Sequence, residues 1–203
     1  NAAVARMQGR GNGPVEVEAE MSHAAADVIF RTLFSIPIDH AVAARVFARF
    51  RDYQRAQPLL NLAAFLPLPR WMPRLHRRSA RRAARDIRRL MTDLTEERAT
   101  AIHAGRAPDD LATKIMTTPD PQTGRCFSPA EMVDQVAIFF LAGHETSASA
   151  LAWALYLLAL FPDVQTRARA EAQALPENPT FSDISRLGFL RDIFRETLRL
   201  YPP

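Results

Sequence analysis

The fold is decided by the stretch from Ser128 to Phe161, which reads SPAEMVDQVAIFFLAGHETSASALAWALYLLALF. Ser128 can cap a helix, Pro129 suits the first helical position, and Glu131 stands three residues after the cap. No further proline follows until Pro162. The pattern therefore predicts one helix over about 129–161, roughly 50 Å long at a rise of 1.5 Å per residue.

This long helix is apolar on nearly every side over 136–141 and again over 151–161. Such a run indicates a helix buried in the middle of a protein, and a transmembrane span is the alternative. An uncompensated carboxylate is costly in lipid, and Glu145 stands near the centre of the run. We therefore expect no membrane segment in this stretch.

The polar interruption at the centre of the helix is Ala142-Gly143-His144-Glu145-Thr146. Gly143 lacks a side chain, so a flat or bulky group can approach the helix closely. The hydroxyl of Thr146 can bond to the carbonyl of Ala142 one turn earlier, which loosens the helix and opens a small groove. Glu145 could relay protons into that groove. A packing glycine beside a water-satisfied polar pair explains the same residues equally well.

The remainder of the chain predicts a mainly helical, all-α protein. Among its 203 residues are only 7 glycines but 15 prolines, and the prolines mark breaks between apolar-periodic segments. The length allows one domain or part of a larger one. The expected segments are an irregular opening (1–14), helices over about 15–34, 39–53, 74–104, 162–175 and 188–200, an apolar loop over 58–73 and an exposed connection over 105–128.

The charge pattern leaves several partners open. The net charge is +4, and arginines recur at three- and four-residue steps on one broad face of the expected helix after Pro73. A solvated helix side, a contact with a redox partner or lipid, and a helical nucleic-acid-binding regulator all fit such a face. No helix-turn-helix signal accompanies it, so we regard nucleic acid as an unlikely partner.

Cysteine usage indicates a reducing compartment. The chain has one cysteine, Cys126, so no disulfide framework can form within it. No zinc-protease motif, nucleophile elbow, phosphate loop or paired-cysteine site is present. In particular, the position four residues after His144 is Ala148 rather than a second histidine.

The last expected helix carries Glu196 and Arg199, which are three residues apart and can pair on one face. Taken alone, an exposed pair of this kind is common and contributes little stability.

Two of these motifs together resemble the cytochrome P-450 family. Ala142-Gly143-His144-Glu145-Thr146 resembles the family's central-helix signature, Ala/Gly-Gly-x-Asp/Glu-Thr. The segment FRETLRLYPP over 194–203 resembles its Glu-x-x-Arg helix, with the Leu-x-Pro-Pro ending. The two stand in the family's order, about 50 residues apart.

The resemblance assigns a role to each residue of the central motif. Thr146 would be the oxygen-activating alcohol and Glu145 the acid beside it, the pair taking part in the protonation of dioxygen. Ala142 and Gly143 would lie against the haem, and His144 would be structural. Ile138 and Leu141 would face the substrate pocket.

The resemblance also implies a function for the parent protein. A haem-dependent monooxygenase of this family inserts one oxygen atom of O2 into an apolar organic substrate, with electrons from a ferredoxin or flavin reductase. Glu196 and Arg199 would be architectural, locking their helix to a later segment. The apolar loop over 58–73 would form part of a lid above the substrate. The arginine- and alanine-rich composition favours a soluble, cytoplasmic, bacterial enzyme.

The family's iron ligand is not expected among these residues. It is a cysteine in a Phe-x-x-Gly-x-Arg-x-Cys-x-Gly loop, well beyond the Glu-x-x-Arg helix, and Cys126 lacks the flanking pattern. We therefore assign no metal ligand here. The resemblance implies the central part of the family's fold, a single partial domain over 1–203 with its sheets mostly missing. We expect this internal fragment to be haem-free and inactive by itself. A non-catalytic remnant acting as a binding module remains the alternative.

Overall fold

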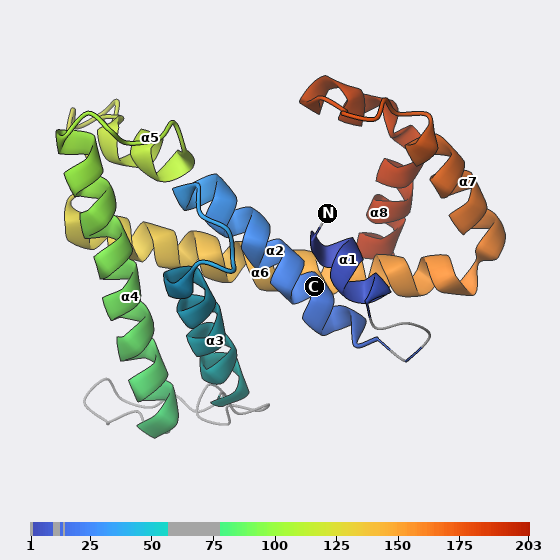
Figure 1. Ribbon diagram of the computed structural model, residues 1–203, viewed down its shortest axis with the longest axis horizontal. Helices are drawn as coiled ribbons and strands as arrows, with labels where there is room; N and C mark the ends of the chain where they lie inside the picture. The colour runs from blue at the N-terminus through green and yellow to red at the C-terminus, as the bar shows by residue number, and fades with distance from the viewer. Residues whose placement is uncertain (1, 10–12, 14, 57–77) are drawn as a thin grey trace. The chain divides into compact units, whose positions relative to one another are not determined.

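A computed structural model describes residues 2–9, 13, 15–56 and 78–203 (Figure 1). Every regular element within these ranges is a helix, which confirms the all-α prediction. In chain order they are α1 (Ala2–Gln8), α2 (Val17–Phe34), α3 (Ala41–Ala56), α4 (Arg78–His103), α5 (Leu111–Thr117), α6 (Pro129–Leu160), α7 (Pro162–Gln173), the 3₁₀ helix η2 (Phe181–Arg186) and α8 (Gly188–Leu200).

The chain divides into two compact units. One comprises Asn1–Ala26 and Leu141–Pro203, and the other Asp27–Phe140. The long helices α2 and α6 each contribute to both units. The expected single partial domain over 1–203 remains a prediction.

Helix α6 begins as its sequence predicts. Glu131 Oε2 accepts hydrogen bonds from the backbone N–H of Ser128 (2.8 Å) and from its hydroxyl (2.6 Å), while the Glu131 N–H donates to Ser128 Oγ at 3.3 Å. This reciprocal capping box satisfies backbone donors that the first helical turn leaves without partners. The bonds from Ser128 lower the pKa of Glu131 below its ordinary value. The helix ends at Leu160, directly before α7.

The core of the second unit is built on aromatic rings. The Phe140 ring of α6 lies 5.2 Å from that of Phe30 and 4.4 Å from that of Phe50, measured between centroids. All three side chains are buried, and so are Ile87 and Met91 of α4. Helices α2, α3, α4 and α6 therefore share one apolar interior.

Three segments differ from the sequence-based expectations. The opening stretch, expected to be irregular, contains α1, and the connection over 105–128 contains α5, whose N-cap Asp110 accepts a hydrogen bond from the Thr113 N–H. The 3₁₀ helix η2 was not anticipated from the pattern. The expected apolar loop and lid over 58–73 lie outside the described residues.

Candidate functional site

The hydroxyl predicted to bond back to the helix does so. Thr146 Oγ1 donates to the carbonyl oxygen of Ala142 at 2.6 Å. The proton of the hydroxyl is thereby engaged, while the lone pairs of Oγ1 remain able to accept. Ala142, Glu145 and Thr146 are all exposed. The acid and the alcohol of the central motif thus lie on an open surface of α6.

The opposite side of the same stretch is closed by α2. Met21 and Ala25 pack with Ala148 in one buried cluster, and Ala152 lies against it. Small side chains on α6 let the two helices approach closely. His144 is only 2% exposed, and its burial supports the structural role expected for it. One side of α6 is therefore fixed by packing, so the residues on its open side are held in place.

Large apolar side chains border the motif on the open side of α6. Ile138 is 57% exposed and Leu141 is 40% exposed, whereas side chains of this type are ordinarily buried. Between them and the next large side chain on this face, Trp153, the helix carries the small residues Ala142 and Gly143. A flat apolar group fits such a surface, because nothing bulky projects at Ala142 and Gly143 and apolar side chains flank them. The residues present are thus compatible with haem on this face.

An aromatic cluster joins α6 to Tyr201, the residue that follows α8. The Trp153 ring stacks on that of Tyr201, with centroids 4.0 Å apart and planes 5° from parallel. Tyr156 meets the same indole edge-on at 5.7 Å. The cluster holds the C-terminal end of α8 against α6.

The Glu-x-x-Arg pair forms within α8. Arg199 donates from Nε to Glu196 Oε2 at 2.7 Å and from Nη2 to Glu196 Oε1 at 2.5 Å. These bonds lower the pKa of Glu196 and raise that of Arg199. Both side chains are more than half exposed, so another part of the protein can pack against the pair. Its architectural role remains a prediction.

Glu171 of α7 is a positioning residue that the sequence did not reveal. Its carboxylate oxygens accept hydrogen bonds of 2.8 Å from the backbone N–H groups of Phe189 and Leu190, at the start of α8. Arg167 lies 3.8 Å above the centroid of the Phe189 ring. The only local signal would have been the absence of a capping side chain before Gly188, and nothing in that signal points to a residue 17 positions earlier.

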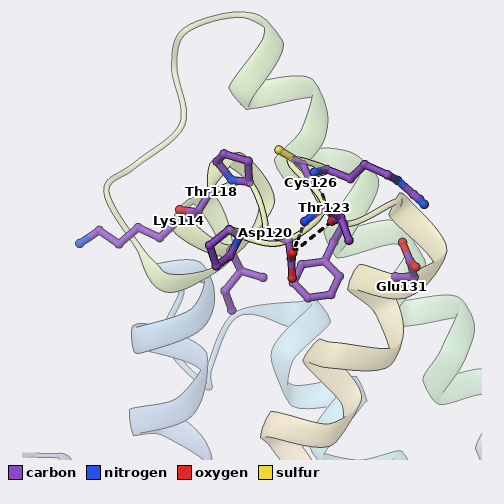
Figure 2. A pocket seen from close by; sticks show the side chains of 11 residues that line it. Lys114, Thr118, Asp120, Thr123, Cys126 and Glu131 are labelled. Carbon is purple, nitrogen blue, oxygen red and sulfur yellow. Dashed lines mark hydrogen bonds between the residues drawn. The ribbon is translucent and has the colours of Figure 1, made fainter.

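Cys126 lies in a loop and not on a helix. It is exposed in the loop between α5 and α6, at a hollow of about 580 Å³ that also involves Lys114 and Glu131 (Figure 2). The loop is tightened by Asp120, whose Oδ1 accepts from the N–H groups of Gln122 and Thr123. Cys126 is not on the open surface of α6 that carries the central motif.

Two findings concern metal ions and membranes. Within the described ranges, no three His, Cys, Asp or Glu side chains gather closely enough to hold a metal ion. Of the helices described, none alone is long and apolar enough to cross a bilayer, although α6 and α7 meet the length and composition criteria together as a pair bent by 116°.

The profile of the cytochrome P450 family matches residues 1–203. The chain therefore belongs to the cytochrome P450 family, a class of haem-binding oxidoreductases.

Individual relatives agree with this assignment. The chain is 36% identical over 183 residues to a cyclooctat-9-en-7-ol 5-monooxygenase of Streptomyces melanosporofaciens, a match covering 87% of this chain and 38% of the relative. It is 29% identical to an 11-oxo-beta-amyrin 30-oxidase of Glycyrrhiza uralensis, over 95% of this chain and 38% of that protein. The chain thus spans well under half the length of the curated relatives it matches.

Solved structures give the same fold. The crystal structure of the cytochrome P450DA heme domain aligns with a TM-score of 0.73 at 25% identity, covering 98% of this chain and 43% of that one. Another cytochrome P450 crystal structure aligns with a TM-score of 0.69 at 26% identity, over 97% of this chain and 45% of that one. The helices described above correspond to the helical part of this fold.

Proposed function

We propose that the protein containing this chain is a haem-dependent monooxygenase that inserts one oxygen atom of O2 into an apolar organic substrate. The observation that carries the proposal is the Thr146 to Ala142 hydrogen bond beside Glu145, on the open face of α6. Family membership and the names of the relatives, a monooxygenase and an oxidase, support it. Haem, when bound, supplies the oxidation chemistry.

We assign the positioning, proton-transfer and substrate-binding roles to residues of α6. The Thr146 hydroxyl donates its hydrogen bond to the carbonyl oxygen of Ala142, so its oxygen can accept a hydrogen bond from a water molecule. That bond positions the water molecule at the reacting centre. The exposed Glu145 carboxylate picks up protons from solvent and passes them toward that water. Ala142 and Gly143 leave room for the flat face of the cofactor. Ile138 and Leu141 contact the apolar substrate and exclude bulk water.

The remaining partners follow from this chemistry. Inserting one oxygen atom and reducing the other to water requires two electrons, which we assign to a ferredoxin or a flavin reductase. We place the enzyme in the cytoplasm of a bacterium, in line with the Streptomyces relative. We do not assign Cys126 as the haem ligand, because it lies in the loop before α6 and not on the face that carries Thr146.

The test is Thr146→Ala in the complete enzyme, with Thr146→Ser and Ser147→Ala as matched variants. A positioned proton-transfer step contributes about a hundredfold or more to rate, and Thr146 holds the water that carries the proton, so product formation should fall by that order in Thr146→Ala. Oxygen consumption should continue and yield hydrogen peroxide instead. Thr146→Ser should retain most product formation, because it keeps a hydroxyl at the same place.

Ser147→Ala controls for the loss of any hydroxyl on this helix and should behave as the unaltered enzyme. Equal product yield from Thr146→Ala and Ser147→Ala would contradict the role assigned to Thr146. A complete protein that binds no haem would contradict the proposed function as a whole.

A further inference from the structure

A stripe of charged side chains runs along the outer face of α4. Its five members are exposed and follow one another at steps of three or four residues, so they share one face: Arg81, Arg85, Arg89, Asp93 and Glu96. The side chains of the opposite face are buried in the core of the second unit: Ala80, Ala83, Ile87, Met91 and Leu94. The stripe is therefore directed away from the interior of its unit.

The ion pairs of α4 with its neighbours lie beside the stripe and not in it. Arg88 Nη1 lies 2.9 Å from Asp134 Oδ1 of α6. On the side toward α3, Arg49 Nε lies 3.5 Å from Asp86 Oδ2. Among the residues that the structure describes, no ion pair involves a member of the stripe. Its positive and negative charges are thus both uncompensated within one copy of the chain.

The two signs occupy separate halves of α4. The arginines lie in the N-terminal half, whose first turn has no acidic residue, and Asp93 and Glu96 lie in the C-terminal half. The helix dipole favours the reverse order, with acids near the N-terminus and cations near the C-terminus. Pairing within a helix is also best when the acid precedes the base by four residues, and in the stripe the bases come first. The order lowers the stability of α4, so its explanation lies in a contact made outside the helix.

The partner that matches both halves of the stripe is a second copy of α4 running in the opposite direction. The middle of α4 lies between Leu90 and Met91. Arg85 stands five residues before Leu90, and Glu96 stands five residues after Met91, so reversal about the middle places them opposite each other. A uniformly anionic partner, such as nucleic acid, would instead be repelled by the acidic half of the stripe.

We propose that two copies of the complete protein associate through the outer faces of their α4 helices, antiparallel, with Arg85 facing Glu96 and Arg89 facing Asp93. Under the two-fold symmetry of such a dimer each contact occurs twice, which gives four ion pairs. An interface made by one charged helix face is small and polar, which is typical of a transient, salt-sensitive dimer. This inference does not depend on the proposed oxygenase activity.

The test is sedimentation velocity of the complete protein over a concentration series at low and at high salt. The unaltered protein should form dimers at low salt and dissociate at high salt. The variant R85E/R89E makes the stripe mostly acidic, and D93R/E96R makes it basic. Each exposed ion pair contributes up to about fivefold, and each variant replaces four such pairs by like charges, so its dissociation constant should rise at least about tenfold.

An equimolar mixture of R85E/R89E and D93R/E96R should restore the dimer, because the acidic stripe of one variant then faces the basic stripe of the other. The control R106E/R169E, at exposed positions outside the stripe, should dimerise within about twofold of the unaltered protein. Both stripe variants place charges in the order that the helix dipole favours, so α4 should stay folded, which circular dichroism checks. A monomer at every concentration at low salt would overturn the proposal, whatever anionic vesicle or nucleic acid the arginines then bind. So would undiminished dimerisation of either stripe variant, or a mixture that stays monomeric.

Discussion

At the scale of single residues, the second unit depends on one buried ion pair. Arg98 Nη2 lies 2.7 Å from Asp110 Oδ2, and it also donates to the carbonyl oxygen of Phe34 at 2.7 Å. Asp110 Oδ2 accepts from Ser35 Oγ at 3.0 Å. Ser35 has a left-handed φ of 58°, which is unfavourable for a residue with a side chain. The network thus fastens the strained end of α2 to both α4 and α5.

Asp110→Asn should strongly destabilise the protein. The change removes the charge opposite Arg98, whose side chain is only 9% exposed, and an uncompensated buried charge costs about 3–5 kcal/mol. Urea unfolding of the complete protein measures the effect. Asp109→Asn is the matched control, because Asp109 is 85% exposed beside Lys114 and its loss should change the free energy of unfolding by less than about 1 kcal/mol. Equal effects of the two substitutions would show that the buried pair contributes no special stability.

At the scale of elements, helix ends determine how the first unit is assembled. Glu171 acts as a remote cap for α8, and its hydrogen bonds from Phe189 and Leu190 lower its pKa below the ordinary value of 4.5. A carboxyl group with a lowered folded-state pKa contributes stability that is fully present above the ordinary value. That contribution is lost as the pH falls through the folded-state pKa.

Glu171→Gln should therefore lower the unfolding midpoint at neutral pH and weaken its decline in acid. The amide offers one acceptor oxygen where the carboxylate offers two, so one N–H of α8 loses its partner. Thermal unfolding measured from pH 7 down to about pH 3 tests this behaviour. Glu177→Gln, at an exposed loop position, is the control. Parallel pH profiles for Glu171→Gln and the unaltered protein would contradict the linkage.

The capping box of α6 gives a second prediction at this scale. Ser128→Ala removes both the donor to Glu131 and the acceptor for its N–H, and loss of an N-cap costs about 1 kcal/mol. Ser128→Asp should retain most of the stability, because a carboxylate can accept from the same N–H group. Urea unfolding of the two variants distinguishes a specific cap from a general effect of substitution. A deficit in Ser128→Asp as large as that in Ser128→Ala would contradict the capping role.

Sequence alone predicted the elements whose signals are local. The start of α6 follows from Ser128, Pro129 and Glu131, and the return bond from Thr146 to Ala142 follows from their separation of one helical turn. The Arg98 to Asp110 pair was not foreseen, and neither was the Glu171 cap. The bond from Arg98 to Phe34 joins positions 64 apart, and no local periodicity encodes such a contact. Helices α1, α5 and η2 are too short for their periodicity to be distinguished from a turn.

At the scale of the whole molecule, α6 carries large apolar side chains that the described residues leave exposed. Ile138, Phe139, Leu141, Trp153 and Tyr156 are all between 38% and 57% exposed. Monomeric proteins rarely leave such a row uncovered, since contiguous exposed apolar patches mark contact sites. The relatives of this chain are far longer than the chain itself, which covers 38% of the first two compared.

Residues 1–203 expressed alone should consequently behave differently from the complete protein. We expect the isolated segment to bind the hydrophobic dye ANS, to unfold without a cooperative transition and to show no thiolate-type spectrum with haem and carbon monoxide, since its one cysteine is Cys126. The complete protein should bind little dye and unfold cooperatively. Replacing Cys126 with Ser in the complete protein should leave its haem spectrum unchanged, and loss of that spectrum would identify Cys126 as a ligand after all. Cooperative unfolding of the isolated segment would mean that its two units cover their apolar surface without further chain.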